Sequence, residues 1–428
     1  MSFYDTFSQC PDSQLQSNLK TLHEHLSPAN EDEHIPDQYY YSSDDFNSLL
    51  KTNYNETEQV SAFTCLHFNC RSLPHNFDAL TLFLSSLTLK SSVIGLTETW
   101  LNENSSLDMF KMTDYAFISN SRKSKRGGGV GMYIRNSVKY KRRPDLDAYS
   151  SSSESIFIEV DLGRQKILIG TVYRPPNQSE DDFLIYLNKV LNVVESEKKL
   201  LYLMGDFNLN LLNVGSVQYV DDFLDTMLSN SINPLIRYPT RVSPNSQTLI
   251  DNIFTNDPDA YCSGLLLTDI SDHFPIFCIA NKSFCNSNKG REKTVIFKRD
   301  VNEANILKFA NILHNTKWDF SGLNANESYD SFLEIFLSAY DSCFPVKPIK
   351  TRSTAISAPW FNDNIRKHIK KKNRLYKLYL KNRSEYRKSV YKQIRNKVVD
   401  LIKQAKKTYY KEQFNKVKGN MKKNMECN

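Results

Sequence analysis

The sequence has no long uninterrupted apolar run. Its longest apolar stretches are broken by charge or are much shorter than the ~20 residues that a membrane span requires. The first residues also lack the basic region and the apolar stretch of a secretory signal. We therefore expect no membrane partner and an intracellular location, nuclear or cytoplasmic, for a chain that is not secreted.

The eight cysteines include no Cys-x-x-Cys pair, and their spacing matches no zinc-finger pattern. In a reducing compartment such residues are predicted to be buried apolar thiols. The glycine cluster at residues 127–129 is not followed by the Gly-Lys-Ser/Thr of a phosphate-binding loop. We interpret it as a turn before a strand at residues 130–134.

The charge is distributed very unevenly along the chain. Residues 345–428 contain 25 Lys and Arg against 5 Asp and Glu, whereas residues 1–344 contain 30 basic and 43 acidic residues. A basic C-terminal part on an acidic body is expected when one segment contacts a polyanion.

Composition divides the first two thirds of the chain into two parts. Residues 1–60 have 11 acidic and 2 basic side chains, no glycine and little apolar periodicity, so we predict an acidic, mostly disordered leader. Residues 62–281 alternate short β-branched and aromatic runs with helical stretches at 78–89 and 181–194. That alternation indicates an α/β domain.

The last third is predicted to be helical. Residues 292–345 form a connector with helices around 302–314 and 329–344, and residues 346–428 form a basic helical tail. One face of the tail is apolar and comprises Val390, Ile394, Val398, Leu401, Ala405 and Tyr409. Tyrosines interleave with the basic residues, which favours contact with nucleic acid, DNA and also RNA, over the alternative of a brace packed on the body.

Polar side chains follow the apolar runs of the α/β segment at the points where they stop. In open α/β sheets, sites are built outside the strand ends. Two further polar segments occur after residue 247. The candidates are Asn69, Glu98, Tyr173, Asp206, Asn208, Asp251, Asp272 and His273.

This set of side chains suits phosphodiester hydrolysis. An anionic diester requires a hard cation held by oxygen ligands such as carboxylates, a group that activates water, and donors for the non-bridging oxygens. No Ser or Cys nucleophile is paired with a base, so direct attack by water is favoured over a covalent intermediate. Any one of these residues alone is more often a helix cap or a turn residue, but six segments in one order are more specific.

The tetrapeptide Tyr219-Val-Asp-Asp222 imitates the catalytic box of a reverse transcriptase. It runs directly into apolar residues at helical spacing. We therefore predict that Asp221 and Asp222 lie in the first turn of a helix, where the helix dipole favours acidic side chains.

Taken together, the motifs resemble the endonuclease/exonuclease/phosphatase family, and more narrowly the apurinic-type endonuclease of non-LTR retrotransposons of the jockey and chicken-repeat kind. The resemblance covers about residues 62–281 and rests on Asn69-Cys-Arg-Ser-Leu, Thr97-Glu-Thr-Trp-Leu, Gly127-Gly-Gly-Val, Val172-Tyr-Arg-Pro-Pro, Gly205-Asp-Phe-Asn, Thr248-Leu-Ile-Asp and Ser271-Asp-His. It implies a four-layer α/β sandwich, two mixed β-sheets flanked by helices. The chain ends before a reverse transcriptase would fit, so we expect a reading frame truncated at that point.

The resemblance also implies a role for each site residue. Glu98 would be the principal ligand of Mg²⁺, with Mn²⁺ as an alternative metal, and Asn69 and Asp272 would lie close to it. Asp206 would handle the attacking water or the leaving-group proton, and His273, oriented by Asp251, would hold a phosphate oxygen. Asn208 and Tyr173 would position the phosphate, and Thr240 and Thr248 match positions near the DNA. Arg71 and Arg174, within the motifs, are further candidates for contact with nucleic acid. Arg126, in the basic run before the glycine cluster, could also reach a DNA backbone, with a solvated loop as the alternative.

The expected function is a Mg²⁺-dependent DNA endonuclease that nicks one strand and leaves a 3′ hydroxyl. One alternative is another member of the superfamily acting on abasic sites, RNA or a phospholipid headgroup. The other is a nucleic-acid-binding protein with an inert enzyme domain, in which the tail is the working part. Because all motifs lie within residues 62–281, we expect that segment to fold and cut without the rest.

Overall fold

The computed structural model describes residues 17–22, 40–53, 62–122, 127–148, 153–162, 165–243, 246–257, 261–283, 295–299, 301–322, 324–350, 359–381 and 384–416. The chain divides into two compact units. The first comprises residues 1–286 together with 356–428, and the second comprises residues 287–355.

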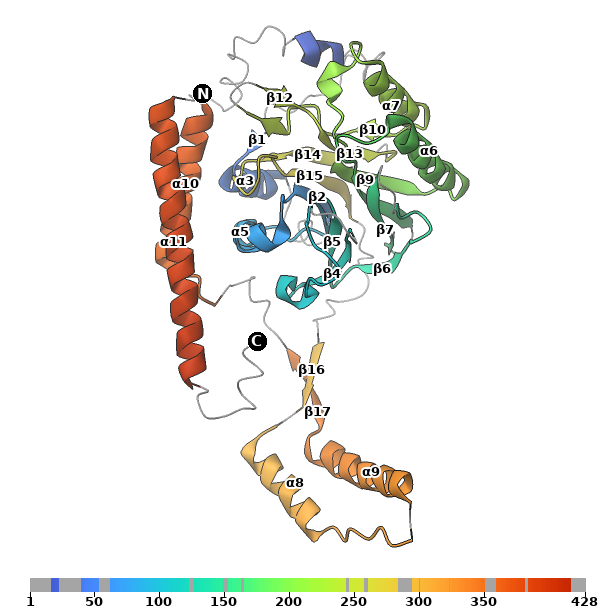
Figure 1. The fold of residues 1–428 in the computed structure, drawn as a ribbon, viewed down its shortest axis with the longest axis vertical. Coiled ribbons are helices and arrows are strands. Elements are labelled where there is room, and N and C mark those ends of the chain that lie inside the picture. The colour runs from blue at the N-terminus through green and yellow to red at the C-terminus, as the bar shows by residue number, and fades with distance from the viewer. Residues whose placement is uncertain are drawn as a thin grey trace. The chain divides into compact units, whose positions relative to one another are not determined.

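Two large mixed sheets form the centre of the first unit (Figure 1). The seven-stranded sheet has the order β1 (Tyr40–Tyr41), β14 (Tyr261–Leu266), β15 (Ile276–Ser283), β2 (Ala62–Asn69), β3 (Val93–Thr97), β5 (Val130–Arg135) and β4 (Tyr115–Asn120). The six-stranded sheet has the order β10 (Asn233–Pro234), β13 (Asp251–Thr255), β9 (Leu200–Asp206), β8 (Lys166–Tyr173), β7 (Glu154–Asp161) and β6 (Lys139–Arg142).

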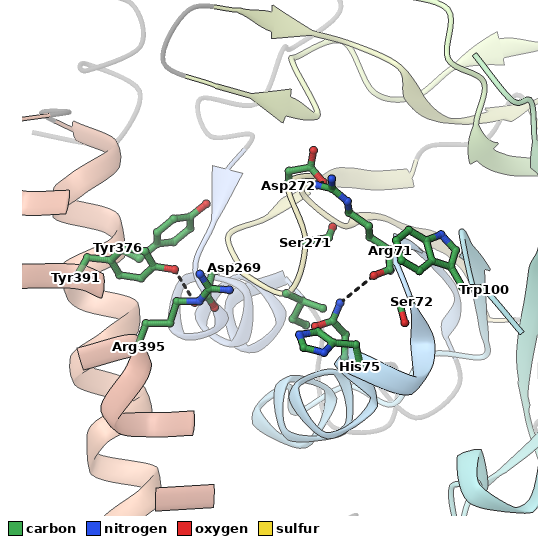
Figure 2. A pocket seen from close by; sticks show the side chains of 12 residues that line it. Arg71, Ser72, His75, Trp100, Asp269, Ser271, Asp272, Tyr376, Tyr391 and Arg395 are labelled. Atoms are coloured by element: carbon green, nitrogen blue, oxygen red, sulfur yellow. Dashed lines mark hydrogen bonds and ion pairs between the residues drawn. The ribbon is translucent and has the colours of Figure 1, made fainter. Parts of the chain in front are cut away.

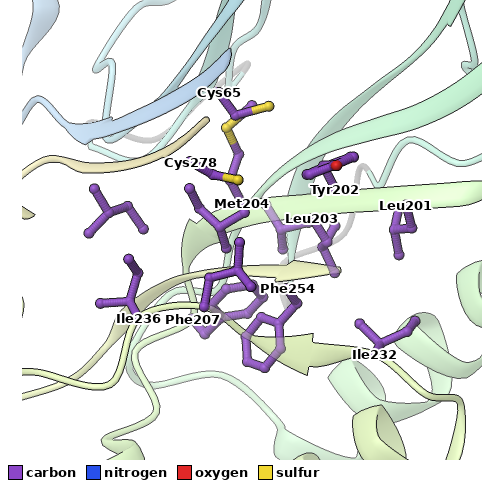
Figure 3. Close-up of a cluster of buried hydrophobic side chains, with 14 of the residues drawn as sticks. Cys65, Leu201, Tyr202, Leu203, Met204, Phe207, Ile232, Ile236, Phe254 and Cys278 are labelled. Atoms are coloured by element: carbon purple, nitrogen blue, oxygen red, sulfur yellow. The ribbon is translucent and has the colours of Figure 1, made fainter. Parts of the chain in front are cut away.

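The seven-stranded sheet is buried on both faces. Successive side chains of a strand point to opposite faces, so β2 contributes Cys65 to the core shared with the six-stranded sheet and Leu66 to a second core. Val93 and Ile94 of β3 divide in the same way. Figure 3 shows part of the shared core, where Cys65 and Cys278 of one sheet lie near Met204 and Tyr202 of the other.

Helices cover the outer face of each sheet. Helices α3 (Ser43–Asn53) and α5 (Leu73–Ser86) pack in the second core, on the seven-stranded sheet. Helices α6 (Glu180–Ser196) and α7 (Gln218–Ser229) pack on the six-stranded sheet. The predicted four-layer α/β sandwich is confirmed, and the Tyr219–Asp222 segment lies in α7 with Asp221 in its first turn, as predicted.

The prediction of a mostly disordered leader over residues 1–60 does not hold for residues 40–53, which form a strand and a helix. Tyr40 and Tyr41 pair in parallel with Leu265 and Leu266 of β14, and the Tyr40 hydroxyl donates to the carbonyl of Pro239 at 2.8 Å. Helix α3 then buries Phe46 and Leu50. The α/β body therefore includes a segment before the predicted boundary at residue 62.

The second unit is a pair of helices with a two-stranded ribbon. Helices α8 (Glu303–Asn315) and α9 (Ala325–Cys343) agree with the two predicted helices. The sequence did not predict β16 (Val295–Arg299) and β17 (Val346–Lys350), which pair antiparallel. Residues 346–350, assigned by the sequence to the basic helical tail, are thus a strand of this unit.

The tail consists of helices α10 (Asp363–Lys381) and α11 (Glu385–Lys416), which lie side by side and pack on the α/β body (Figure 1). Trp360 and Ile365 form a small core with Leu82 of α5. Leu401, Ala405 and Tyr409, part of the predicted apolar face, pack against this core. The apolar face therefore braces the tail on the body.

Ion pairs at the same interface join tail lysines to acidic residues of the body. Lys377 bonds to Asp45 at 3.0 Å, and Lys406 and Lys372 contact Asp78 and Asp269. Strand β1, helix α3 and the tail thus all contact residues 62–281. That residues 62–281 fold and cut without the rest stays a prediction.

Replacing Trp360 by alanine is expected to loosen the tail. The ring is 7% exposed and has the Lys406 ammonium over its face at 5.0 Å, so its loss should cost about 3 kcal/mol of docking free energy. Trypsin should then cut the Lys- and Arg-rich helices α10 and α11 much faster than in the wild type. Trp318→Ala, at a 37% exposed tryptophan of the second unit, is the matched control. Equal protease resistance of Trp360→Ala and the wild type would contradict this packing.

Among the described residues, no helix is both long enough and apolar enough to cross a membrane. The described cysteines are free thiols, and Cys65, Cys70, Cys278 and Cys343 are buried, as predicted. Cys10, Cys285 and Cys427 lie outside the described residues.

Candidate active site

The candidate site lies at neighbouring strand ends of both sheets. Strands β2 and β3 run parallel with Asn69 opposite Thr97, so Asn69 is the last residue of β2 and Glu98 follows β3 directly. In the other sheet, β8 and β9 run parallel and end together at Tyr173 and Asp206. The antiparallel β13 begins opposite Asp206, at Asp251. The two sheets thus bring most of the predicted residues together.

The close approach of β8 and β9 at the site depends on a glycine. Gly205 pairs with Val172 one residue before Asp206. A Cβ at Gly205 would lie 1.9 Å from the carbonyl oxygen of Val172. No side chain fits there, so the glycine of the Gly205-Asp206-Phe-Asn208 motif allows the two strand ends to close on one another.

One amide joins the two sheets at the centre of the site. The Asn69 Nδ2 donates to Glu98 Oε1 at 2.8 Å and to Asp206 Oδ2 at 2.8 Å. Asn69 is 3% exposed and Asp206 is fully buried, whereas Glu98 is partly exposed. Two carboxylates therefore converge on a single NH₂ group at the edge of the solvent.

The backbone around Glu98 adopts a rare conformation. The φ angles of Glu98 and Trp100 are +52° and +56°, in the left-handed region that side chains of this size seldom occupy. The Glu98 carbonyl accepts from Ser72 N at 2.8 Å, and Trp100 N donates to the Gly128 carbonyl at 2.9 Å. Trp100 Nε1 also donates to Glu98 Oε2 at 3.3 Å. These contacts fix the carboxylate beside Asn69, and such strained residues cluster at functional sites.

A buried histidine–aspartate pair lies beside this amide. His273 Nδ1 lies 2.8 Å from Asp251 Oδ2, and the same oxygen accepts from Thr240 Oγ1 at 2.6 Å. Burial alone would lower the pKa of His273, but the carboxylates of Asp251, Asp206 and Asp272 outweigh it and raise the pKa to about 9. The imidazole is therefore protonated at neutral pH, and its Nε2–H is a second donor.

Asp206 is the buried acid nearest to that pair. Burial and the neighbouring Asp251 carboxylate raise the pKa of Asp206 to about 7, against the opposing effect of protonated His273. Asn208 N donates to its Oδ1 at 3.1 Å. Asp206 can therefore gain or lose a proton close to physiological pH, which suits a catalytic acid or base.

The structure also groups Asp206, Asp251 and His273 as potential metal ligands. Each offers one ligand atom, and these atoms lie within 4.8 Å of one another. Among the described residues this is an acid–histidine group that could hold a metal ion. The protonated ring and the bond to Asp251 instead favour a hydrogen-bonded pair, because a metal ligand must be a neutral imidazole.

The Asp272 carboxylate contacts two arginines and not the Asn69 amide. It forms ion pairs with Arg71 at 3.1 Å and with Arg241 at 2.7 Å. Burial would raise its pKa, but His273, Arg241 and Arg71 hold it below the usual value. The resemblance implies that Asp272 lies close to the metal, whereas its contacts show a carboxylate that is paired with two guanidinium groups.

Two predicted phosphate-positioning residues differ in their contacts. Tyr173 is 6% exposed, and burial together with Glu98 and Asp206 raises the pKa of its hydroxyl, so it remains a neutral donor beside both acids. Asn208 has φ +48° and turns its Nδ2 to the carbonyl of Arg174 at 2.8 Å. The side-chain amide of Asn208 thus holds the loop rather than pointing its donor into the site.

The predicted nucleic-acid contacts divide into surface and buried residues. Arg71 is exposed, as its predicted role requires, and Thr248 is partly exposed on β12 (Gln247–Thr248). Arg174 is 1% exposed and donates to the Gln178 carbonyl at 3.0 Å, so its guanidinium is engaged within the protein and its contact with DNA stays a prediction. Thr240 is fully buried below Asp251 and positions that carboxylate instead. Arg126 lies outside the described residues.

Three residues that the sequence did not single out contribute to the site. Burial lowers the pKa of His67 to about 4, and this neutral ring lies 3.9 Å from Asp251. Arg241 forms a β-bridge with His273 as well as its ion pair with Asp272. Glu154, at the start of β7, contacts Arg122 and the backbone N of Gly129, and Gly129 belongs to the glycine turn that also bonds to Trp100. A signal existed for His67, because a histidine in an apolar strand two positions before Asn69 faces the same side of the sheet.

Comparison with known proteins finds a family model that matches just under half of the chain. Residues 66–273 match the model of the family described as Endonuclease/Exonuclease/phosphatase family. None of the curated proteins compared with the chain matches it. The fold is thus one shared by nucleases and phosphatases.

Several solved structures are similar to the chain. One is the endonuclease domain of TRAS1, a telomere-specific non-LTR retrotransposon. It is 14% identical, the match covers 51% of this chain and 98% of that chain, and the TM-score is 0.40. A family protein from Leptotrichia buccalis has 18% identity, coverage of 51% and 98%, and a TM-score of 0.41. The AP endonuclease LMAP from Leishmania major has 13% identity, coverage of 62% and 98%, and a TM-score of 0.43.

Proposed function

We propose that the domain over residues 66–273, which matches the endonuclease/exonuclease/phosphatase family, is a Mg²⁺-dependent DNA endonuclease of a non-LTR retroelement. It would hydrolyse one phosphodiester bond of a duplex and leave a 3′ hydroxyl. One observation carries this proposal: the Asn69 amide joins Glu98 and Asp206 directly beside the protonated His273–Asp251 pair.

The residues present fit a divalent cation at Glu98. The partly exposed carboxylate of Glu98 and the buried carboxylate of Asp206 both face the Asn69 NH₂ group. Hard cations prefer carboxylate oxygens as ligands. Glu98 would hold the ion with help from Asn69, and Asp272 would not, because its oxygens are engaged by two arginines. When bound, the ion would neutralise charge on the phosphate.

His273 would act as a donor to the phosphate. Its Nδ1–H is committed to Asp251, which fixes the ring orientation and keeps the positive charge on the imidazole. The Nε2–H is then the group that can hold a non-bridging oxygen as negative charge develops there. Thr240 supports the pair by donating to the same Asp251 oxygen.

Asp206 would move the proton of the attacking water. A buried carboxylate whose pKa is raised to about 7 can both take up and return a proton near neutral pH. Its Oδ2 and Oδ1 accept from Asn69 Nδ2 and Asn208 N, so its position is fixed. The other candidate acid, Glu98, would remain with the metal.

DNA as the substrate is supported by the charges around the opening of the site. Arg71 and Arg241 are 55% and 47% exposed at their side chains, and both lie at Asp272, next to His273. Together they carry one positive charge more than the carboxylate neutralises, which suits a phosphate backbone. Contact of the tail with RNA stays a prediction.

The pH dependence of nicking follows from two groups. Asp206 works as a base when ionised, so kcat/KM should rise with pH through about 7. His273 works as a donor when protonated, so kcat/KM should fall as the pH rises through about 9. Initial nicking rates at constant ionic strength should therefore give a bell with its maximum between these values. A rate that does not change through pH 7 would rule out Asp206 as the base.

A further inference from the structure

A polar cleft of about 620 Å³ lies beside the candidate active site, within the first unit (Figure 2). One wall belongs to the active-site loops and carries Arg71, Trp100 and Asp272. The other wall belongs to the tail, with Tyr376 on α10 and Tyr391 and Arg395 on α11. Asp269 lies between them, on the loop that leads to His273.

Asp269 joins the tail to this loop. Its side chain is 10% exposed, contacts Lys372 and accepts from the Tyr391 hydroxyl at 2.7 Å. Burial would raise its pKa, but Lys372, Tyr391 and Arg395 keep the pKa below its usual value. The wall formed by α10 and α11 is therefore attached to the segment that carries Asp272 and His273.

The charged residues that line the cleft balance, but two further cations behind the lining give a surplus of positive charge. Asp272 faces two cations, Arg71 and Arg241. Asp269 also faces two cations, Lys372 in contact and Arg395 nearby. Each carboxylate thus neutralises one of its two partners, which leaves one net positive charge on each side of the cleft.

Aromatic rings accompany these charges. Trp100 lies on the loop wall beside Arg71, and the Tyr376 and Tyr391 rings on the tail wall have centroids 5.1 Å apart (Figure 2). Alternation of cationic and aromatic side chains along a groove is how proteins bind single-stranded nucleic acid, with phosphates at the cations and bases against the rings.

We propose that this cleft binds an unpaired stretch of nucleic-acid strand next to the phosphate that is cut, with Arg71 and Arg395 contacting its phosphates. Its volume lies in the range of sites that hold small ligands, which is enough for part of a single strand. The position of the strand relative to the cut rests on the proposed function, whereas the binding itself does not require cleavage.

The test measures binding of a fluorescent oligothymidylate to the full chain by anisotropy, in EDTA so that no metal-dependent cleavage occurs. Arg395→Gln should weaken binding by about tenfold, because it removes a charge-assisted contact with phosphate, and should lower the slope of log K against log salt by about one. Arg395 is exposed, and Asp269 retains Lys372 and Tyr391, so the variant keeps the docking contacts. Arg395→Lys should recover most of the affinity.

Lys397→Gln is the matched control. Lys397 is exposed on the same helix and does not line the cleft, and its replacement removes the same charge. Its oligothymidylate affinity should stay within about twofold of the wild type. Equal weakening by Arg395→Gln and Lys397→Gln would show that only the bulk charge of the tail matters and would overturn the proposal. Equal competition by a blunt duplex would also overturn it.

The outcomes separate the two proposals. If the chain nicks no DNA but binds oligothymidylate through Arg395, the cleft is a strand-binding site and the proposed function fails. If the chain nicks DNA and Arg395→Gln binds single strands as well as the wild type does, the cleft proposal fails and the endonuclease proposal is unaffected.

Discussion

Replacement of Glu98 by glutamine is expected to reduce Mg²⁺-dependent nicking by at least ~100-fold, since even residues that only support a metal ligand contribute about 10- to 100-fold. Glutamine retains the size of the side chain and an oxygen that can accept from Asn69 Nδ2 or Trp100 Nε1. The loss should therefore follow from the missing negative charge rather than from a change of fold. Nicking rates of the two proteins, each saturated with Mg²⁺, measure the effect.

Glu103→Gln is the control for this variant. Glu103 is exposed in the loop after Trp100. Its replacement by glutamine removes the same negative charge near the site without removing a contact of the site. Its nicking rate should equal that of the wild type, and both variants should melt at the wild-type temperature. A Glu98→Gln protein that nicks at the wild-type rate would exclude Glu98 as the metal ligand.

Replacement of His273 by alanine is the second large effect. The imidazolium is expected to donate mainly to charge that develops in the transition state, so kcat should fall at least ~100-fold while the DNA affinity stays within about twofold. Single-turnover rates with saturating enzyme report the chemical step, and binding in EDTA reports the affinity. The alkaline limb of the pH profile should disappear with the ring.

Asp251 becomes a buried carboxylate with fewer partners in this variant, so the melting temperature must be compared as well. His314→Ala, at an exposed histidine of the second unit, should change neither rate nor affinity. A His273→Ala protein with weakened DNA binding and unchanged kcat would show that the ring binds the DNA substrate in the ground state and does not stabilise the transition state.

The site could be predicted largely because its residues stand at strand ends. The runs at 93–97 and 166–172 correspond to β3 and β8, and the polar residues that follow them meet at one edge of the sandwich. Strand periodicity and short motifs are local properties, so the sequence records them directly. The Asn69 contacts to Glu98 and Asp206 could not be predicted in the same way, because they join the two sheets.

The direction in which a polar side chain points was harder to predict. Arg174 belongs to the motif at residues 172–176, and nothing in the sequence distinguishes an arginine that points to solvent from one that is buried below the Asn208 loop. The left-handed backbone at Glu98 and Asn208 also depends on contacts with distant segments. Tertiary contacts decide such positions.

Long-range pairing explains where the structure differs from the predicted boundaries. Strand β1 has two residues and exists because β14, more than 200 residues later, offers it an edge. The acidic composition of residues 1–60 gave no sign of that partner. The tail likewise has an amphipathic face whose partner, Leu82 on α5, is remote in the sequence.

Incubation of the full chain with supercoiled plasmid is the most direct test of the central claim. With Mg²⁺ the plasmid should convert to the open circle, and a DNA polymerase should extend the nick without prior treatment of the end, because the product carries a 3′ hydroxyl. EDTA should abolish the conversion. Conversion that persists in EDTA, or a wild-type rate no greater than that of Glu98→Gln, would contradict the assignment of a metal-dependent endonuclease.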